Sequence, residues 1–367
     1  MSQKQIIGIG IIGTGFARRT QLPAFRACEG ARLVSIASGH LENAERAARE
    51  FEVEHFTGDW RETVSRADVD LISIVTPPST HLEMTLAALD AGKAVLCEKP
   101  MAMNAGETEA MTRRAGETGL LALIDHELRF LPGRRKMREL IRAGEIGRIY
   151  HAKLHFRADS RADAARPWDW WSDARAGGGA LGAIGSHAVD AFRWLLGAEV
   201  AQVNGLLATH VRERAVKQSG ERRAVTTDDE ANLILRFSDG ELTSGATATI
   251  SLSVVESGRP EHKIEVFGSA GALMLEGDKL SRSGTGEGKW QEVLTEQADL
   301  AAGMSDNEWS RGFTIFSRAV IEALREGRAT VEEAATFADG HSTQLVLDAA
   351  HRSHESGCAE TIEASQI

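Results

Sequence analysis

The sequence predicts an α/β domain built on a doubly wound parallel sheet, followed by an α+β domain built on an antiparallel sheet. Three observations lead to this prediction. Short apolar runs alternate with helical patterns over the first 125 residues, a glycine-rich turn follows the first run, and beyond about residue 147 apolar residues alternate with polar ones. Parallel strands are buried on both faces, whereas antiparallel strands commonly keep one face in water.

The first domain is predicted over residues 1–128. Its apolar runs are four to seven residues long, which fits buried parallel strands. These runs are Ile6–Ile12, Arg32–Ala37, Leu71–Val75, Ala94–Cys97 and Leu120–Ile124. The helical stretches between them are Leu41–Phe51, His81–Ala91 and Ala105–Glu117. Such an alternation of strands and helices is typical of a sheet with helices on both faces.

The second domain is predicted over residues 129–355. Alternating segments predict strands at Tyr150–Phe156, Glu230–Phe237, Glu241–Ser251 and His262–Phe267. Helices are predicted at Gly182–Leu196, Trp309–Glu326 and Val331–Glu355, and packing of the last one on the first domain is left open. The polar stretches 211–227 and 283–288 are predicted to be surface loops.

Composition excludes several classes of protein. The chain has 367 residues, 42% of them apolar, and a net charge of −11, which argues against a nucleic-acid partner because such a partner requires a basic face. Its cysteines, Cys28, Cys97 and Cys358, are too widely spaced for a zinc or dithiol site, so no metal is predicted. We see no signal peptide and no apolar run of the ~20 residues that a membrane span needs. We therefore expect a cytoplasmic protein with no membrane partner.

A phosphate-binding turn is predicted where the first strand ends. A literal GxGxxG match begins at Gly8, but its first two glycines fall inside the strand, where no helix N-terminus can face a phosphate. In the later turn, Gly13 permits the bend, Gly15 lets the backbone approach a pyrophosphate, and a helix is expected to start there. Arg18 replaces the usual third glycine, and it either reaches a phosphate or is solvated. The residues predicted to bind the dinucleotide here are Gly13, Thr14, Gly15, Phe16 and Ala17.

The end of the second strand indicates which dinucleotide is bound. Enzymes that use NAD usually place a carboxylate there to hold the ribose hydroxyl groups. This chain has Ser38-Gly39-His40 instead, so Ser38 can donate to a 2′-phosphate and His40 can add charge. We therefore favour NADP over NAD as the cofactor, while Ser38 as a simple strand end remains the alternative.

Ligands of open α/β sheets lie beyond the carboxyl ends of the strands. Two such ends are rich in polar groups, and we predict cofactor contacts there from Thr76, Pro77, Pro78, His81, Glu98 and Lys99. Lys99 precedes Pro100, which favours an extended backbone at the sheet edge. A lysine held beside a cofactor is suited to proton transfer, whereas most lysines are simply solvated.

The second domain offers another acid–base candidate. His187 and Asp190 lie three residues apart on one predicted helix, so Asp190 can orient the imidazole. A purely structural His–Asp pair is the alternative. The run Trp168-Asp-Trp-Trp171 is either an apolar wall of the site or part of the core.

Together these residues resemble the Gfo/Idh/MocA oxidoreductases, the family of glucose–fructose oxidoreductase and inositol dehydrogenase. The motifs that carry the resemblance are Ile12–Gly15, Thr76–Pro78 with His81, Glu98–Pro100, Arg129–Phe130 and Gly185–Asp190. The resemblance implies a Rossmann domain, a second domain with a large open, mainly antiparallel sheet, and a homodimer or homotetramer formed through that sheet. It also implies that Lys99 and His187 are catalytic. One position departs from the family pattern, because Ala183 stands where an aspartate often precedes the histidine by four residues.

The expected function is NAD(P)-dependent hydride transfer between nicotinamide and a sugar, a polyol or a related hydroxy or carbonyl compound. We expect Lys99 to face His187 across the nicotinamide ring. An NAD-dependent glycoside hydrolase that uses transient oxidation and a non-catalytic cofactor-binding protein are the alternatives. Substrate contacts are expected from Glu127, Arg166, Trp170, Asp173, His187 and Asp190.

Overall fold

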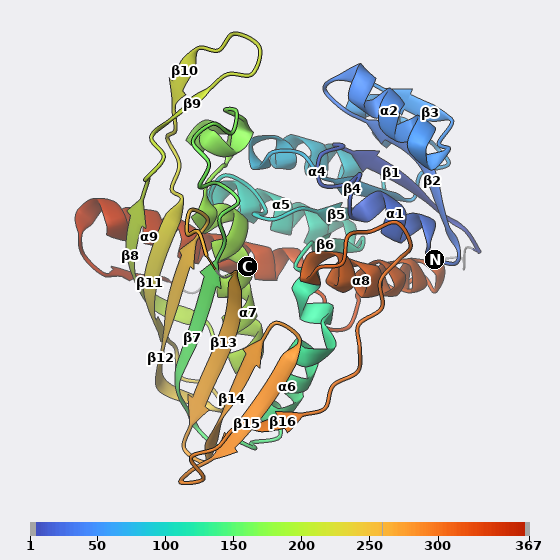
Figure 1. Cartoon of the computed structure of the whole chain (residues 1–367). Coiled ribbons are helices and arrows are strands. Elements are labelled where there is room, and N and C mark those ends of the chain that lie inside the picture. The colour runs from blue at the N-terminus through green and yellow to red at the C-terminus, as the bar shows by residue number, and fades with distance from the viewer. Residues whose placement is uncertain (1–4, 259, 364–367) are drawn as a thin grey trace. The chain divides into compact units, whose positions relative to one another are not determined.

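The computed structural model describes residues 5–258 and 260–363, which form two compact units (Figure 1). The first unit runs up to Leu131 and also includes Gln297–His341. The second unit contains Pro132–Glu296 and, within the described part of the chain, residues 342–363.

The first unit is built on a six-stranded parallel sheet with the order β3-β2-β1-β4-β5-β6. Its strands are β1 (Ile7–Ile12), β2 (Ala31–Ala37), β3 (His55–Thr57), β4 (Leu71–Ile74), β5 (Ala94–Cys97) and β6 (Ala122–Ile124). Its connecting helices are α1 (Gln21–Arg26), α2 (Leu41–Phe51), α3 (Trp60–Ser65), α4 (His81–Asp90) and α5 (Ala105–Thr118). This Rossmann-type sheet confirms the predicted fold class of the first domain. The sequence did not predict β3 and α3, because three and six residues carry too little periodicity.

The first strand shows why the literal glycine motif is not the phosphate turn. Every residue of β1 is buried, as expected for a central parallel strand. A Cβ atom on Gly8 would lie 1.9 Å from the carbonyl oxygen of Asp68, so this glycine serves the packing of the strand.

Helix α1 begins later than the sequence analysis expected. Residues 14–20 form turns, and regular helix starts only at Gln21. Proline lacks an N–H, and in a helix interior its ring collides with the carbonyl four residues earlier. Pro23 therefore fits the first turn of a helix that begins at Gln21, and it does not fit the interior of one that begins at Gly15.

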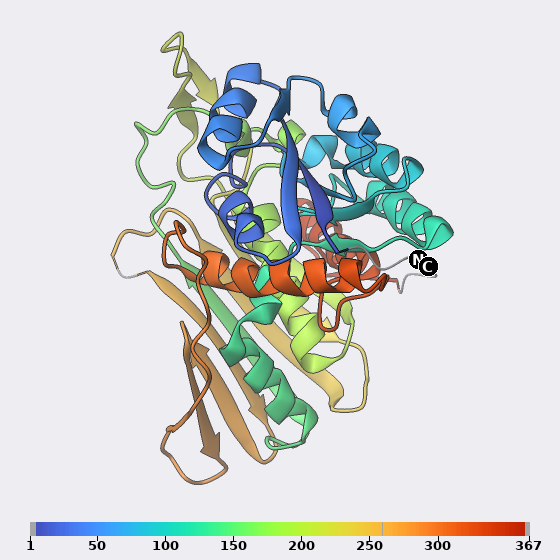
Figure 2. The same cartoon turned by 90° about the vertical axis from the view of Figure 1, so that its right-hand side faces the viewer.

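Residues 297–341, which the sequence analysis assigned to the second domain, belong to the first unit. Helix α8 (Glu308–Arg325), the long orange helix of Figure 2, packs on α1. The ring of Phe313 meets the edge of Phe25 at 5.4 Å, and the ring of Phe316 stacks on Phe130 at 4.7 Å. These four rings are almost fully buried, so their burial holds this distant segment against the Rossmann sheet.

Helix α9 (Phe337–Ser356) begins at Phe337 and not at the expected Val331. Its start is fixed by Thr336, whose backbone N–H and hydroxyl group both donate to Oδ2 of Asp339 at 2.9 Å. In return, the Asp339 N–H donates to the Thr336 hydroxyl group at 3.2 Å, and this reciprocal pattern resembles a capping box, which satisfies unpaired donors at a helix N-terminus. The helix passes from the first unit into the second at Ser342.

The second unit is built on a nine-stranded sheet with the order β16-β15-β14-β13-β7-β12-β11-β8-β17. Its strands are β7 (Ile149–Arg157), β8 (Val200–Ala208), β11 (Glu230–Phe237), β12 (Thr243–Ser253), β13 (Glu261–Gly268), β14 (Gly271–Glu276), β15 (Lys279–Gly284), β16 (Gln291–Val293) and β17 (Glu360–Thr361). Strands β7 and β12 pair in parallel and the other neighbours pair antiparallel. The predicted large, mainly antiparallel sheet is therefore confirmed.

Helices α6 (Pro132–Arg142) and α7 (Ser186–Leu196) pack on this sheet. Burial alternates along β11, which shows that one face of the sheet is packed and the other is exposed. Leu233 and Leu235 are 1% exposed, whereas Ile234 between them is 60% exposed. The predicted loop 211–227 contains a short hairpin, with β9 (Glu213–Ala215) paired to β10 (Arg222–Ala224). Three-residue strands in a polar stretch carry no apolar alternation, which explains why they were missed.

None of the helices in residues 5–258 and 260–363 is both long enough and apolar enough to span a bilayer.

Candidate active site

The first unit gathers most of the predicted cofactor residues at one edge of its sheet. Because all six strands are parallel, their carboxyl ends meet at the same edge. Gly13 follows β1, Ser38 follows β2, Thr76 lies just beyond β4, and Glu98 follows β5. In the order of the sheet, β1 and β4 are neighbours, which is the switch point where dinucleotides bind in such folds.

The glycine turn has the shape that a dinucleotide phosphate needs. Gly13 has a φ of 101°, and a Cβ atom there would lie 2.3 Å from the carbonyl oxygen of Val75. Only glycine fits this bend. A Cβ atom on Gly15 would meet nothing within 4 Å, so this residue leaves open space beside the turn. The N–H groups of Gly15 and Phe16 donate to no other group in the described part of the chain, which leaves them available to a phosphate.

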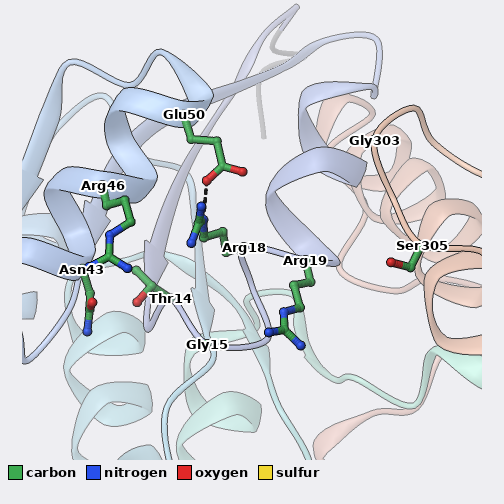
Figure 3. Close-up of a pocket in the computed structure, with 9 residues that line it drawn as sticks. All are labelled: Thr14, Gly15, Arg18, Arg19, Asn43, Arg46, Glu50, Gly303 and Ser305. Carbon is green, nitrogen blue, oxygen red and sulfur yellow. Dashed lines mark hydrogen bonds and ion pairs between the residues drawn. The ribbon is translucent and has the colours of Figure 1, made fainter.

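A hollow of about 470 Å³ lies beside this turn (Figure 3). Its lining residues are Thr14, Gly15, Arg18, Arg19, Asn43, Arg46, Glu50, Gly303 and Ser305. Figure 3 shows Arg46 reaching from α2 toward Thr14, whereas Arg19 lies on the side of Ser305. The lining has three guanidinium groups and one carboxylate, and that carboxylate, Glu50, is ion-paired with Arg18. The net positive charge of the lining suits an anionic ligand.

Ser38 and His40, the residues predicted to favour NADP over NAD, lie at the end of β2. The backbone N–H of Ser38 donates to Thr57 at 3.1 Å, and the Ser38 hydroxyl group accepts the N–H of His40 at 3.4 Å. His40 is exposed and precedes the first residue of α2. The chain thus presents a hydroxyl group and an imidazole where NAD enzymes usually present a carboxylate.

His81, a predicted cofactor contact, joins two loops of the sheet edge. Its Nε2 atom lies 2.8 Å from the carbonyl oxygen of Thr76, and its Nδ1 atom lies 3.2 Å from the carbonyl oxygens of Pro100 and Met101. The side chain is fully buried, and this burial lowers the pKa of His81. The imidazole therefore ties the loop after β4 to the loop after β5.

The other two residues of the predicted Thr-Pro-Pro motif lie next to this tie. Pro77 and Pro78 follow Thr76, and Pro78 begins a short 3-10 turn that leads into α4. The Thr80 hydroxyl group donates to the Thr76 hydroxyl group at 2.7 Å and to the Pro77 carbonyl at 2.9 Å. The motif is thus held as a compact turn at the sheet edge.

Lys99 follows Glu98 at the carboxyl end of β5. Its Nζ atom lies 6.0 Å from the centre of the Trp309 ring, which belongs to the first turn of α8. The Glu98 carboxylate accepts the backbone N–H of Lys99 at 3.3 Å. The segment that carries the lysine is therefore fixed from both sides, by a carboxylate of its own strand end and by an aromatic ring of α8.

Glu127, predicted to bind substrate, lies in the first unit in a 3-10 turn after β6 (Glu127–Phe130). The side chain is 1% exposed. Burial, followed by the charge of Glu98, raises the pKa of Glu127 to about 8. A carboxyl group with this pKa is largely protonated at neutral pH, so it can donate a proton as well as accept one.

The second unit carries His187 and Asp190 on α7. Their side chains are 4% and 2% exposed, and α7 is buried on all sides. A π-helical turn (Leu181–Gly185) precedes α7 directly, and such turns are frequent at functional sites. Ala183, the residue that departs from the family pattern, lies inside this turn.

Three predicted substrate residues lie on an irregular segment of the second unit. Arg166 is exposed and donates to the carbonyl of Ser160 at 3.2 Å. Trp170 is 41% exposed, and Asp173 is paired with Arg175 at 3.1 Å. The expected meeting of Lys99 and His187 stays a prediction, as do all the assigned residue roles.

The comparisons with known proteins agree with this geometry. A family profile described as an oxidoreductase family with an NAD-binding Rossmann fold matches residues 7–126. A second one, described as the GFO/IDH/MocA C-terminal domain, matches residues 134–274. An uncharacterized oxidoreductase of Synechocystis is 30% identical over 76% of this chain and 74% of its own length. The chain belongs to the Gfo/Idh/MocA family of oxidoreductases.

Two further relatives of this Gfo/Idh/MocA protein are informative. A levoglucosan dehydrogenase from Pseudarthrobacter phenanthrenivorans is 28% identical over 94% of this chain and 95% of its own. A solved levoglucosan dehydrogenase in complex with NADH and L-sorbose matches with a TM-score of 0.87 and 26% identity, covering 99% of this chain and 100% of that one. The predicted family and fold class are thereby confirmed.

Four residues of this Gfo/Idh/MocA protein that the sequence analysis did not single out lie next to the predicted ones. Gln21 donates to both Glu98 and Asp125, Trp309 lies beside Lys99, and Arg46 lines the hollow at the glycine turn. A signal existed for Asp125, because it directly follows a predicted strand. Gln21 and Trp309 offered none, since their neighbours are distant in the sequence.

Proposed function

We propose that this protein is a dehydrogenase or reductase that transfers a hydride between a nicotinamide dinucleotide and a carbinol carbon of a sugar or polyol. One observation carries the proposal: Lys99 lies two residues beyond the end of β5, at the sheet edge that also holds the glycine turn. The similarity to a levoglucosan dehydrogenase supports a sugar-like substrate.

The chemistry divides between the dinucleotide and the protein. When bound, the nicotinamide ring accepts or returns the hydride. Lys99 binds the substrate hydroxyl group and exchanges its proton, so that the C=O bond forms as the hydride leaves carbon. His187 of the second unit is proposed as a second acid–base group, oriented by Asp190. Holding the reactants in contact supplies several of the ~7–11 kcal/mol that proximity can offer.

A Lys99→Ala variant tests the proposal. With a panel of sugars and polyols, we expect kcat to fall about 10²- to 10⁴-fold while the dinucleotide still binds. Lys289→Ala is the matched control, because Lys289 is exposed in the second unit. Full turnover by folded Lys99→Ala protein that binds the dinucleotide would overturn the assignment.

The same assay separates the other two functions that the sequence left open. Consumption of a glycoside with no net change in nicotinamide absorbance would favour a hydrolase that uses transient oxidation. Tight dinucleotide binding with no turnover across the whole panel would favour a non-catalytic binding protein.

We further propose NADP as the preferred dinucleotide. Ser38 and His40 replace the usual carboxylate, and Arg46 lines the hollow beside the glycine turn. Arg46 has no ion pair with the described part of the chain, so its charge is available to a 2′-phosphate. Glu50, the carboxylate of the lining, is already paired with Arg18.

The cofactor proposal is tested with Arg46→Gln. Loss of a charge-assisted bond of about 1.5–3 kcal/mol is expected to weaken NADP binding about 10- to 100-fold and to leave NAD binding unchanged. Arg113→Gln is the control, since Arg113 is exposed on α5 at the opposite end of the sheet from α2. Equal loss of NADP and NAD binding, or a native preference for NAD, would contradict the proposal.

A further inference from the structure

Three carboxyl groups are buried beside Lys99, where β5 and β6 end. The residues are 8% (Glu98), 0% (Asp125) and 1% (Glu127) exposed. The hydride transfer proposed above uses none of them. Burying an ionised carboxylate without a paired cation costs several kcal/mol, so a cluster of three needs an explanation.

Gln21 joins two of these groups. Its side-chain Nε2 atom donates to Oε1 of Glu98 at 3.0 Å and to Oδ2 of Asp125 at 2.9 Å. The Ser73 hydroxyl group donates to the Gln21 carbonyl oxygen at 2.5 Å, which fixes the orientation of the amide. Both hydrogens of the amide nitrogen are therefore used to bring the two carboxyl groups together.

Oxygens of Glu98 and Asp125 lie close together, because the same amide nitrogen of Gln21 contacts one oxygen of each. Two ionised carboxylates this close repel each other, and a proton on one of them relieves the repulsion. Burial raises the pKa of Glu98, and it raises that of Asp125 well above its usual range, with the charges of Glu127 and Glu98 adding to the effect. Burial and the proximity of the negative charges thus both favour the protonated form of this pair.

The cluster has few countercharges. Oδ1 of Asp125 and Oε2 of Glu127 are buried without a hydrogen-bond partner among the described residues. Lys99 is the cation that acts on all three carboxyl groups, and Glu308 adds a further negative charge facing Glu127.

The other titratable groups nearby are engaged or neutral. The Arg129 guanidinium group lies 3.4 Å from Asp339 and 3.5 Å from the carbonyl of Glu333. His81 contacts backbone carbonyls through both ring nitrogens, and burial lowers its pKa. His126, between Asp125 and Glu127 in the chain, is 3% exposed.

Helix α8 covers this cluster. A Cβ atom on Gly312 would lie 2.7 Å from the Glu127 carbonyl oxygen, so a glycine is needed for α8 to approach the turn that carries Glu127. Trp309, one turn earlier in α8, lies beside Lys99. Lys99, which is half-buried, and the three buried carboxyl groups therefore lie at the first turn of α8, where the low local dielectric strengthens the electrostatic coupling between them.

We propose that Glu98, Asp125 and Glu127 form a proton store for Lys99. This inference rests on the function proposed above. As the carbinol is oxidised, its C–H electron pair leaves as hydride to the nicotinamide, the O–H bond breaks and the C=O bond forms. Lys99 takes the hydroxyl proton, and the proton that it gives up moves to Glu127 in its ionised form, which becomes the main form as the pH rises past about 8. Reduction of the carbonyl runs the same transfer in reverse, and the store exchanges its proton with water between turnovers.

Infrared difference spectroscopy of the resting protein tests the store without any turnover. We expect a carboxylic acid C=O band at neutral pH that moves in D₂O and loses intensity as the pH rises past about 8, where Glu127 titrates. Glu127→Gln should remove the part that titrates there, and Asp125→Asn should remove a further part of the band. Glu109→Gln is the control, because Glu109 is exposed on α5. The absence of such a band in the native protein would overturn the proposal, whether or not the protein proves to be a dehydrogenase.

Kinetics then test the link to Lys99. Glu127→Gln is expected to lower kcat about 10²-fold and to remove the inflection near pH 8 from its pH profile, while KM for the dinucleotide stays unchanged. Glu127→Asp, which keeps a carboxyl group, should restore the inflection at a shifted pH. An unchanged profile in Glu127→Gln would exclude the proposed role. If Glu127→Gln fails to fold, the Glu127→Asp profile decides, and an inflection unchanged in that variant would contradict the proposal.

Discussion

The side-chain amide nitrogen of Gln21 lies 2.9 Å from Oδ2 of Asp125, although 104 residues separate the two in the chain. Gln21 begins α1, and Asp125 follows β6 at the far edge of the sheet. The contact therefore links the start of the Rossmann unit to its last strand through buried polar groups.

Gln21→Leu should destabilise the first unit. The change removes the only neutral donor that the described residues give to both Glu98 and Asp125, and it leaves the Ser73 hydroxyl group without its acceptor. Leaving buried polar groups unpaired costs about 1–3 kcal/mol each, so we expect a loss of about 2–4 kcal/mol in urea unfolding. Gln218→Leu, at an exposed position, should change the unfolding midpoint little. Equal midpoints for the two variants would show that the amide contributes no stability.

The pH dependence of stability should report the buried carboxyl groups. Glu127 has a pKa of about 8 when folded, against an ordinary value of 4.5. The folded protein binds more protons than the unfolded chain in this interval, so the free energy of unfolding falls as the pH rises from about 4.5 to 8. The slope is at most about 1.4 kcal/mol per pH unit for one group. Urea unfolding at a series of pH values should show a flatter slope in Glu127→Gln.

Asp228 gives a matched comparison in the second unit. Burial raises the pKa of Asp228 to about 6 from an ordinary value of 3.8, although its Oδ2 atom accepts the N–H of Leu181 at 2.6 Å. The free energy of unfolding should again fall with rising pH, here between about 3.8 and 6. Asp228→Asn should flatten this pH dependence in that interval alone. Identical curves of stability against pH for Glu127→Gln and Asp228→Asn would mean that neither group keeps its proton on folding.

Removing the carboxylate from the hollow should strengthen anion binding. Glu50 and Arg18 are both partly exposed, at 42% and 41%, so their pairing is weak and screened. Glu50→Gln releases the Arg18 guanidinium group and raises the positive charge around the glycine turn. We expect NADP to bind about 2- to 5-fold more tightly at low salt, as an exposed pair worth up to about 1 kcal/mol allows, and the gain to vanish at high salt. Weaker binding at low salt would show that Glu50 serves instead to position Arg18.

Gly15→Ala should separate folding from cofactor binding. A Cβ atom there meets nothing within 4 Å, so the thermal midpoint of the cofactor-free protein should stay within about 1 °C. The new methyl group would occupy the space that a pyrophosphate needs, so dinucleotide affinity should fall at least about 10-fold. Gly116→Ala on α5, also with open space around it, is the control and should leave affinity unchanged. Unaltered affinity in Gly15→Ala would move the phosphate site away from this turn.

The sequence by itself determined five of the six strands of the first unit's sheet and the edge at which the predicted cofactor residues lie. Burial on both faces makes a parallel strand a continuous apolar run, and the residue after each run must lie at the carboxyl edge. For this reason Gly13, Ser38 and Glu98 were predicted together. The glycine turn was also readable, since a bend with positive φ requires glycine at one position.

Only the tertiary structure decided what surrounds Lys99. Gln21 and Trp309 carry no local signal in the sequence. Trp309 reaches Lys99 because the packing of Phe313 and Phe316 holds α8 against the Rossmann unit. Gln21 reaches the carboxyl groups from α1. The start of α1 depended similarly on Pro23, whose ring excludes a helix that begins at the glycine turn. Periodicity reports which face of an element is buried, but the partner buried against that face is set by shape and volume across the whole chain.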